Sequence, residues 1–438
     1  MSPRSLRNVR NRAHPDTRVV GDRVSPAMCW LVIGLMVLSS IRGIIVVNTN
    51  LDPGRVYLYV TALLLAVSGV GILISPSYSS LGLGRFKNLV HLNLILGILN
   101  LVIDHLVLGY PLSLGVGMVY VYAAPYILFV FMKIPIQYLR VGLAMVLVAI
   151  AYSVAENFYQ LLSGVDGVQR VIDYNLKIHP NSNDFLSRGA GPTLYRVGGY
   201  TGSYHDSANI LGMVVTFFFI RGLLKKNLLD LALALAGVIS LTLTQSTANL
   251  VVFIFTVSVF TWYTLVRSRA TMTFVYLTLS SVALAFLVLG SGGVMGFFVE
   301  RLSGVGYWTG MFNQLDPDTL IRLLPFALAG HITSLGGIGD SGLTEVGLLR
   351  ILYQLGTIHT AVLYSILLYP VWRWFKVRRW CATAVPAVAA IVFGFLSLLH
   401  YGSLFRVTSV FIFYAFGAIC LSHVTNHQGV EHMERRSS

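Results

Sequence analysis

The chain has 438 residues, of which 55% are hydrophobic and only 11% are charged, and its mean hydropathy is +0.74. Soluble domains carry about 25% charged residues, so a soluble globule of this size could not cover its surface with these charges. Intrinsic disorder is excluded as well, because disordered chains are poor in hydrophobic residues. The composition therefore predicts a polytopic membrane protein.

The net charge of +14 does not indicate nucleic-acid binding. The basic residues stand in small groups between apolar runs, as the topology rule for membrane proteins predicts. The three cysteines, Cys29, Cys381 and Cys420, fall within apolar runs and support neither a disulfide framework nor a zinc site. The first apolar run follows a basic stretch and lacks a small-residue cleavage site, so we expect a retained signal anchor.

A membrane-spanning helix needs about 20 mostly apolar residues, and the sequence offers about twelve such runs. They cover 27–47, 56–75, 89–109, 112–132, 138–157, 207–224, 228–244, 247–266, 272–290, 343–370, 381–399 and 403–423. We therefore expect an all-α fold, a polytopic transmembrane helix bundle over 27–423. A basic N-terminal tail at 1–26 precedes it, and a short tail at 424–438 follows it.

The lysines and arginines test this topology. Most of the 31 basic residues fall in connections that the span count places on one side, such as Arg85 with Lys87 and Arg221 with Lys225. Because basic residues mark the cytoplasmic side, we expect both termini to be cytoplasmic. Two long outward-facing loops, 158–206 and 291–342, would then contain short helices. One of these helices is predicted to follow Asp316-Pro317-Asp318, which has the residue types of a helix start.

Charged residues at membrane depth are costly and are functional candidates by default. Here most of them lie near the outer ends of the expected spans. They are Arg42, Asp104, His105, Glu345, Arg350 and Arg406. The pattern indicates a site at the outer mouth of the bundle. The alternative is that these side chains reach the interface or pair with one another.

Two stretches carry a more specific pattern. The first runs from Arg196 through Gly199 to a polar cluster that leads straight into a span, His205-Asp206-Ser207-Ala208-Asn209. The second runs from Arg322 through an amphipathic stretch to a glycine-rich turn at 336–339 and then to Asp340 and Glu345. Together they resemble the O-antigen polymerase and ligase family of bacterial membrane glycosyltransferases, over about 190–360.

Two details of this resemblance favour polymerase over ligase. Arg188 and Gly199 fit an arginine-to-glycine spacing that is typical of the polymerases. The ligases carry a histidine at the start of the span after the second loop, whereas this chain has acidic residues at 340–345. The alternatives are a ligase that transfers finished polymer to a lipid or protein acceptor, and a lipid-linked oligosaccharide flippase or other transporter.

The resemblance implies an enzyme of the bacterial inner (plasma) membrane that makes O-antigen or exopolysaccharide. It would transfer glycan repeat units from undecaprenyl pyrophosphate to a sugar hydroxyl on the outer face. Arg196 and Arg322 would stabilise the departing pyrophosphate, because guanidinium groups bind phosphate with two hydrogen bonds and stay charged. His331 and Glu345 are the first candidates for the general base. The expected substrate-binding residues are Arg188, His205, Asp206, Asn209, Arg301, Asp340 and Arg350.

For each of the two arginines, a purely structural role is the alternative. Arg196 could form a structural salt bridge in its loop, and Arg322 could pair with Asp318 four residues earlier on the same helix. No metal is expected, because the one close carboxylate pair, Asp316 and Asp318, is explained by helix capping. No cofactor is expected either, because the donor lipid is already activated. The expected partners are the lipid-linked oligosaccharide, membrane lipid and a chain-length regulator protein, with no nucleic acid.

Overall fold

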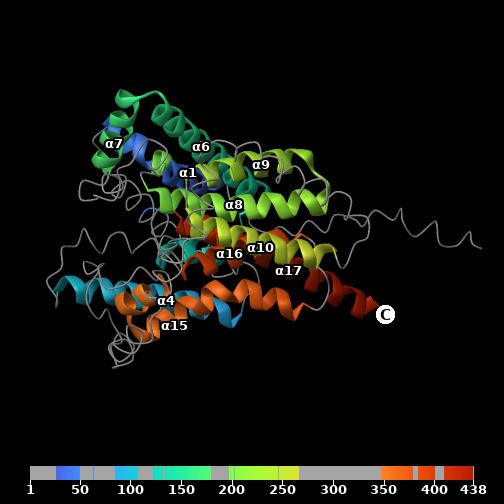
Figure 1. The fold of residues 1–438 in the computed structure, drawn as a ribbon. Coiled ribbons are helices and arrows are strands. Elements are labelled where there is room, and N and C mark those ends of the chain that lie inside the picture. The colour runs from blue at the N-terminus through green and yellow to red at the C-terminus, as the bar shows by residue number, and fades with distance from the viewer. Residues whose placement is uncertain are drawn as a thin grey trace, which may run out of the picture.

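The computed structural model describes residues 26–49, 63, 84–106, 122–131, 134–178, 197–201, 203–244, 246–265, 347–377, 383–399 and 409–437. This part of the chain is helical and contains no strand, which confirms the predicted all-α class there. Figure 1 shows long helices that run side by side in one bundle.

The elements follow the chain in this order: α1 (Pro26–Ser40), α2 (Arg42–Thr49), α4 (Arg85–Leu106), η2 (Tyr126–Phe131), α6 (Ile136–Leu162), α7 (Val165–Ile178), η5 (Gly199–Thr201), α8 (Tyr204–Lys225), α9 (Leu228–Leu243), α10 (Thr247–Leu265), α15 (Gly347–Lys376), α16 (Val385–Ser397) and α17 (Val410–Ser437). Element η2 is a single π-helical stretch, and η5 is one turn of 3₁₀ helix.

Four helices in the described part are long and apolar enough to cross a membrane, namely Phe86–Ile103, Ile136–Leu162, Tyr204–Lys225 and Leu355–Lys376. Shorter apolar helices are Pro26–Leu38, Leu228–Leu243, Ala248–Thr264, Val385–Ser397 and Val410–Thr425. All of them overlap expected spans, so the chain is a membrane protein by its helices as well as by its composition. The expected spans 56–75, apart from residue 63, and 272–290 lie outside the described residues, as do residues 112–121 and 132 of the expected span 112–132. The count of twelve spans therefore stays a prediction.

The span expected at 343–370 is interrupted. Helix α15 breaks at Gly356, whose φ of 75° and ψ of 172° are not helical. The Thr360 hydroxyl donates to the Ile351 carbonyl at 3.4 Å, although nine residues of continuous helix would separate them by roughly 13 Å along the axis. The chain therefore turns sharply at Gly356. The spanning segment is Leu355–Lys376, and Arg350 belongs to the short helix before the break.

Two other boundaries differ from expectation. Helix α17 continues to Ser437, so the tail expected at 424–438 is largely helical. In the first long loop, α6 extends to Leu162 and is followed by the amphipathic α7. Helix α7 buries Val171 and Ile172 and exposes Asp173 on its other face, which is the arrangement expected for a short helix at the membrane surface.

Helix α8 is the centre of the described bundle, since 94% of its apolar window is buried and it packs against α9, α16, α10 and α6. Glycine makes the closest of these contacts possible. A Cβ atom on Gly212 would lie 2.0 Å from Cζ of Phe393 on α16, so a larger residue would have to displace the Phe393 ring. Such small residues are typical of helix contacts in membranes.

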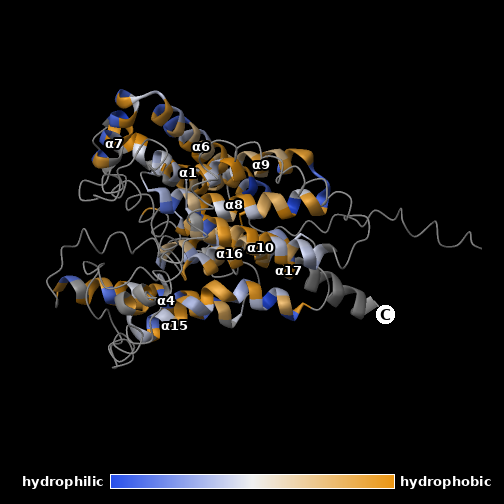
Figure 2. Cartoon of the chain, viewed as in Figure 1, coloured by the Kyte–Doolittle hydropathy of each residue, from blue (hydrophilic) through white to orange (hydrophobic). Residues whose placement is uncertain are grey.

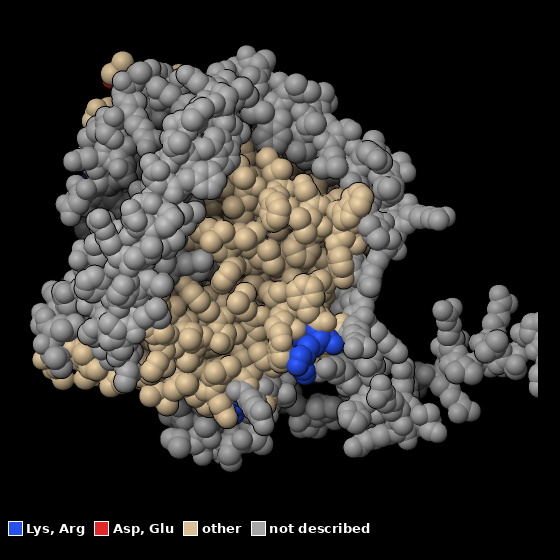
Figure 3. Space-filling view, turned by 60° about the horizontal axis from the view of Figure 1, so that its bottom comes forward, with Lys and Arg blue, Asp and Glu red and all other residues tan. Residues whose placement is uncertain are grey.

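The outer surface of the bundle is apolar. Large hydrophobic side chains are exposed on peripheral helices, for example Ile95 on α4, Val148 on α6 and Trp262 on α10. Figure 2 shows hydrophobic residues along most of the length of α8, α9 and α10. Figure 3 shows a broad face with few charged side chains among the described residues. These surfaces suit contact with lipid tails.

Candidate functional site

The turn before α8 carries the first motif. Gly199 has a φ of +57°, and a Cβ atom there would lie 2.4 Å from the Ser153 hydroxyl oxygen on α6. Both the backbone conformation and the close approach to α6 require glycine at this position. Val197, which follows Arg196 directly in sequence, is completely buried. The motif glycine, Gly199, thus fixes the backbone against α6 three residues after the predicted phosphate-binding arginine.

Buried hydroxyl groups close this turn onto α8. The side-chain oxygen of Thr201 lies 2.9 Å from the Gly198 carbonyl oxygen and 2.6 Å from the Ser207 hydroxyl oxygen. The Ser203 hydroxyl accepts a hydrogen bond from the Asp206 backbone N–H at 3.4 Å and caps the helix. A serine at this position satisfies one of the free N–H groups of the first turn. The turn and the start of α8 therefore form one rigid unit.

Three of the predicted substrate-binding residues lie together at this end of α8. Asp206 is 1% exposed and Asn209 is fully buried. The Asn209 amide oxygen accepts a hydrogen bond from the Ser397 hydroxyl at 2.9 Å, which joins α8 to α16. The Asn209 amide nitrogen has no hydrogen-bond partner among the described residues. His205 packs its ring 3.9 Å from the ring of Tyr204.

The structure does not place the side chains of the other predicted site residues. Arg350 is placed only through the backbone of α15. The remainder lie outside the described residues: Arg188, Arg196, Arg301, Arg322, His331, Asp340 and Glu345. The meeting of the two outer loops at one site stays a prediction.

A tyrosine cluster adjoins the turn. The Tyr200 hydroxyl donates a hydrogen bond to the Glu156 carboxylate on α6, and the rings of Tyr152 and Tyr174 each lie 6.3 Å from the Tyr200 ring. Burial raises the pKa of Tyr200, and the hydrogen bond and negative charge of Glu156 raise it further. Glu156 is not among the residues that the sequence motifs predict for the site. Glu156 could have been found from the sequence, because it is a charged residue at the end of the expected span 138–157 and such residues are functional candidates.

A second polar cluster was also missed from the sequence. His359 is fully buried, and its Nδ1 lies 2.8 Å from the Asn100 amide nitrogen, while its Nε2 lies 3.2 Å from the Asn93 amide oxygen. These contacts fit a neutral histidine with its proton on Nε2, since an amide nitrogen only donates and an amide oxygen only accepts. The cluster joins α4 to α15 three residues after the break at Gly356. The sequence feature that could have revealed this cluster is the pair Asn93 and Asn100, which lie seven residues apart and therefore on one face of an apolar helix.

The opposite end of α8 is basic. Arg221 donates to both carboxylate oxygens of Asp230 at the start of α9, and both residues are buried. Arg140 and Lys225 line the same pocket as Arg221. The positive-inside rule placed these basic residues on one side of the membrane, and the structure places them at one end of the bundle. Fifteen helical residues, roughly 22 Å along the axis, separate Arg221 from Asp206.

No protein-family model matches the chain, and a comparison with curated proteins finds no match. The resemblance to the polymerase and ligase family therefore depends on the two motifs and on the hydropathy pattern. Within the described part of the chain, no three His, Cys, Asp or Glu side chains come together as metal ligands would.

Proposed function

We propose that the chain is a polysaccharide polymerase of the bacterial inner membrane. It transfers glycan repeat units from undecaprenyl pyrophosphate to a sugar hydroxyl on the outer face, and both of its termini are cytoplasmic. Its substrates are lipid-linked oligosaccharides, and a chain-length regulator protein is its expected partner. The enzyme uses no metal.

The chemistry assigns distinct roles to the arginines and the base. The acceptor hydroxyl oxygen forms a bond to the anomeric carbon of the donor, and the bond from that carbon to the pyrophosphate oxygen breaks. Arg196 and Arg322 stabilise the charge on the departing undecaprenyl pyrophosphate, which is usually the largest catalytic contribution. The hydroxyl proton passes to a general base, for which His331 and Glu345 are the first candidates.

The observation that supports this proposal most directly is the rigid turn between the first motif arginine and α8. The glycine of the motif has a steric role at Gly199. The polar cluster that closes the motif lies at the end of the central helix, where Asp206 is buried near the positive end of the helix dipole. Such a unit could hold an adjoining phosphate-binding arginine in a fixed direction.

The proposal predicts that Arg322→Ala and Arg196→Ala each lower polymer formation about a hundredfold, by analogy with the loss of one oxyanion donor. The measurement is the surface polysaccharide ladder of complemented cells, with membrane insertion checked by immunoblotting. Lys177→Ala is the matched control, because this basic residue lies exposed on α7 in the same outer loop as Arg196. Normal polymer length in Arg322→Ala would overturn the role given to Arg322.

One observation favours a transporter as the second candidate. Buried polar side chains beside an interrupted helix are typical of substrate and ion sites in secondary transporters, and His359 with its two asparagines lies next to the break at Gly356. The lipid-linked sugars of cells without the gene separate the candidates. Single repeat units on the outer face indicate a polymerase, and long polymer on the carrier lipid indicates a ligase. Repeat units trapped on the cytoplasmic face indicate a transporter.

A further inference from the structure

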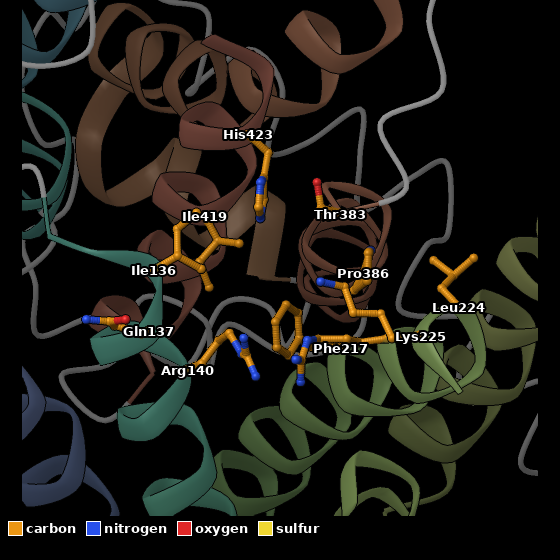
Figure 4. Close-up of a pocket in the computed structure, with 11 residues that line it drawn as sticks. Ile136, Gln137, Arg140, Phe217, Leu224, Lys225, Thr383, Pro386, Ile419 and His423 are labelled. Atoms are coloured by element: carbon orange, nitrogen blue, oxygen red, sulfur yellow. The ribbon is translucent and has the colours of Figure 1, made fainter. Parts of the chain in front are cut away.

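A basic pocket lies at the end of the bundle opposite Asp206. It encloses about 280 Å³ between α6, α8, the start of α16 and α17. Its polar lining consists mainly of Arg140, Arg221, Lys225, Thr383 and His423. Figure 4 shows the nitrogen atoms of Arg140 and His423 directed into the space between these helices. With water taking about 30 Å³ per molecule, the pocket has room for roughly nine waters, enough for a small polar headgroup.

The positive charge in this pocket exceeds the negative charge around it. Asp230 neutralises Arg221, but neither Arg140 nor Lys225 lies within ion-pair distance of a carboxylate in the part of the chain that the structure describes. The Nε atom of Arg140 is buried and has no hydrogen-bond partner there. Arg140 and Arg221 are close enough to repel each other. An anion in the pocket would relieve this repulsion and satisfy the Arg140 donor.

The start of α16 adds to the attraction for an anion. Its N-cap is Ala384, which provides no side-chain hydrogen bond, and the adjoining residues Thr383 and Pro386 line the pocket. Backbone N–H groups at a helix start carry partial positive charge and bind phosphate well. This helix end therefore reinforces the basic side chains on α6 and α8.

The remaining lining is apolar. Ile136, Phe217, Leu224 and Ile419 border the basic groups, and Leu228, at the same end of the bundle, is 75% exposed. A soluble anion would gain nothing from these contacts, whereas a lipid could place its headgroup on the cations and its glycerol and chain carbons on the apolar residues. Basic pockets between spans on the cytoplasmic side are typical binding sites for anionic lipid headgroups.

We propose that the basic pocket binds the phosphate group of an anionic membrane phospholipid. The site is separate from the proposed polymerase site at the other end of α8. The proposal does not depend on the polymerase function, because lipid binding can be measured without it.

The test is native mass spectrometry of the full-length protein in detergent, with phosphatidylglycerol or phosphatidylethanolamine added at equal concentration. We expect tighter retention of phosphatidylglycerol by the wild type. Arg140→Gln and Lys225→Gln should each weaken that retention about fivefold, the effect of one basic residue near a lipid surface. Lys376→Gln is the matched control, because it removes one positive charge from the end of α15, where the side chain lies 4.0 Å from the Trp372 ring centroid and outside the pocket.

Each outcome decides the proposal. Equal retention of phosphatidylglycerol by wild type, Arg140→Gln, Lys225→Gln and Lys376→Gln would mean non-specific lipid contact and would overturn it. Protection of the wild type from heat by inorganic phosphate, without retention of phosphatidylglycerol, would identify a soluble anion and overturn the lipid assignment. Because Lys225 is exposed, Lys225→Gln provides a variant whose folding should be unaffected if Arg140→Gln does not fold.

Discussion

The buried pair between Arg221 and Asp230 gives a sharp prediction for stability. Asp230→Asn keeps the shape of the side chain and removes its charge. Arg221, which is only 7% exposed, would then remain charged beside Arg140 and Lys225. Removing one partner of a buried ion pair costs about 3–5 kcal/mol, because the other charge is left without compensation. We expect a loss of free energy of unfolding within this range.

The assay is reversible unfolding of the purified protein in mixed micelles, followed by tryptophan fluorescence. Asp173→Asn is the matched control, because Asp173 is exposed on α7 and bonds only to Gln169 among the described residues. It should change stability by less than about 0.5 kcal/mol. The double variant Arg221→Met with Asp230→Leu should recover most of the loss, since an apolar pair can replace a buried ion pair at little cost. Equal stability of Asp230→Asn and wild type would refute the reasoning.

Two further outcomes follow from close packing and from a half-buried tyrosine hydroxyl. Gly212→Ala should destabilise the protein by about 1–3 kcal/mol, because the new Cβ atom would meet the Phe393 ring. Gly34→Ala has open space around it and should be neutral or stabilising by up to about 1 kcal/mol; equal melting temperatures for the two variants would contradict this account. The raised pKa of Tyr200 means that the folded state keeps a proton which the unfolded state releases above the ordinary pKa of 10.0. The corresponding stability is fully present below pH 10 and is lost as the pH rises above it. Tyr200→Phe should therefore show a shallower loss of stability at alkaline pH, and an unchanged pH profile would count against a raised pKa of Tyr200 in the folded state.

The sequence by itself determined the class of the protein and the extent of several helices. Helices α9 and α10 end within one residue of the expected spans at 228–244 and 247–266. The reason is local, because an apolar run in a membrane forms a helix that satisfies its own backbone hydrogen bonds, and polar or basic residues mark its ends. The motif that contains Gly199, Asp206 and Asn209 was also visible in sequence, because a glycine and a polar cluster stand directly before an apolar run.

Only the tertiary structure decided which distant residues meet. The break at Gly356 was hidden because apolar residues continue on both sides of it. The contacts of His359 with Asn93 and Asn100 join helices more than 250 positions apart in the chain. The packing of α6 against α8 likewise brings Arg140 together with Arg221 and Lys225 in one pocket. Hydropathy along the sequence shows where a helix begins and ends, and so where each residue lies along it. The direction that a side chain faces across a helix contact depends on the packing of the whole bundle.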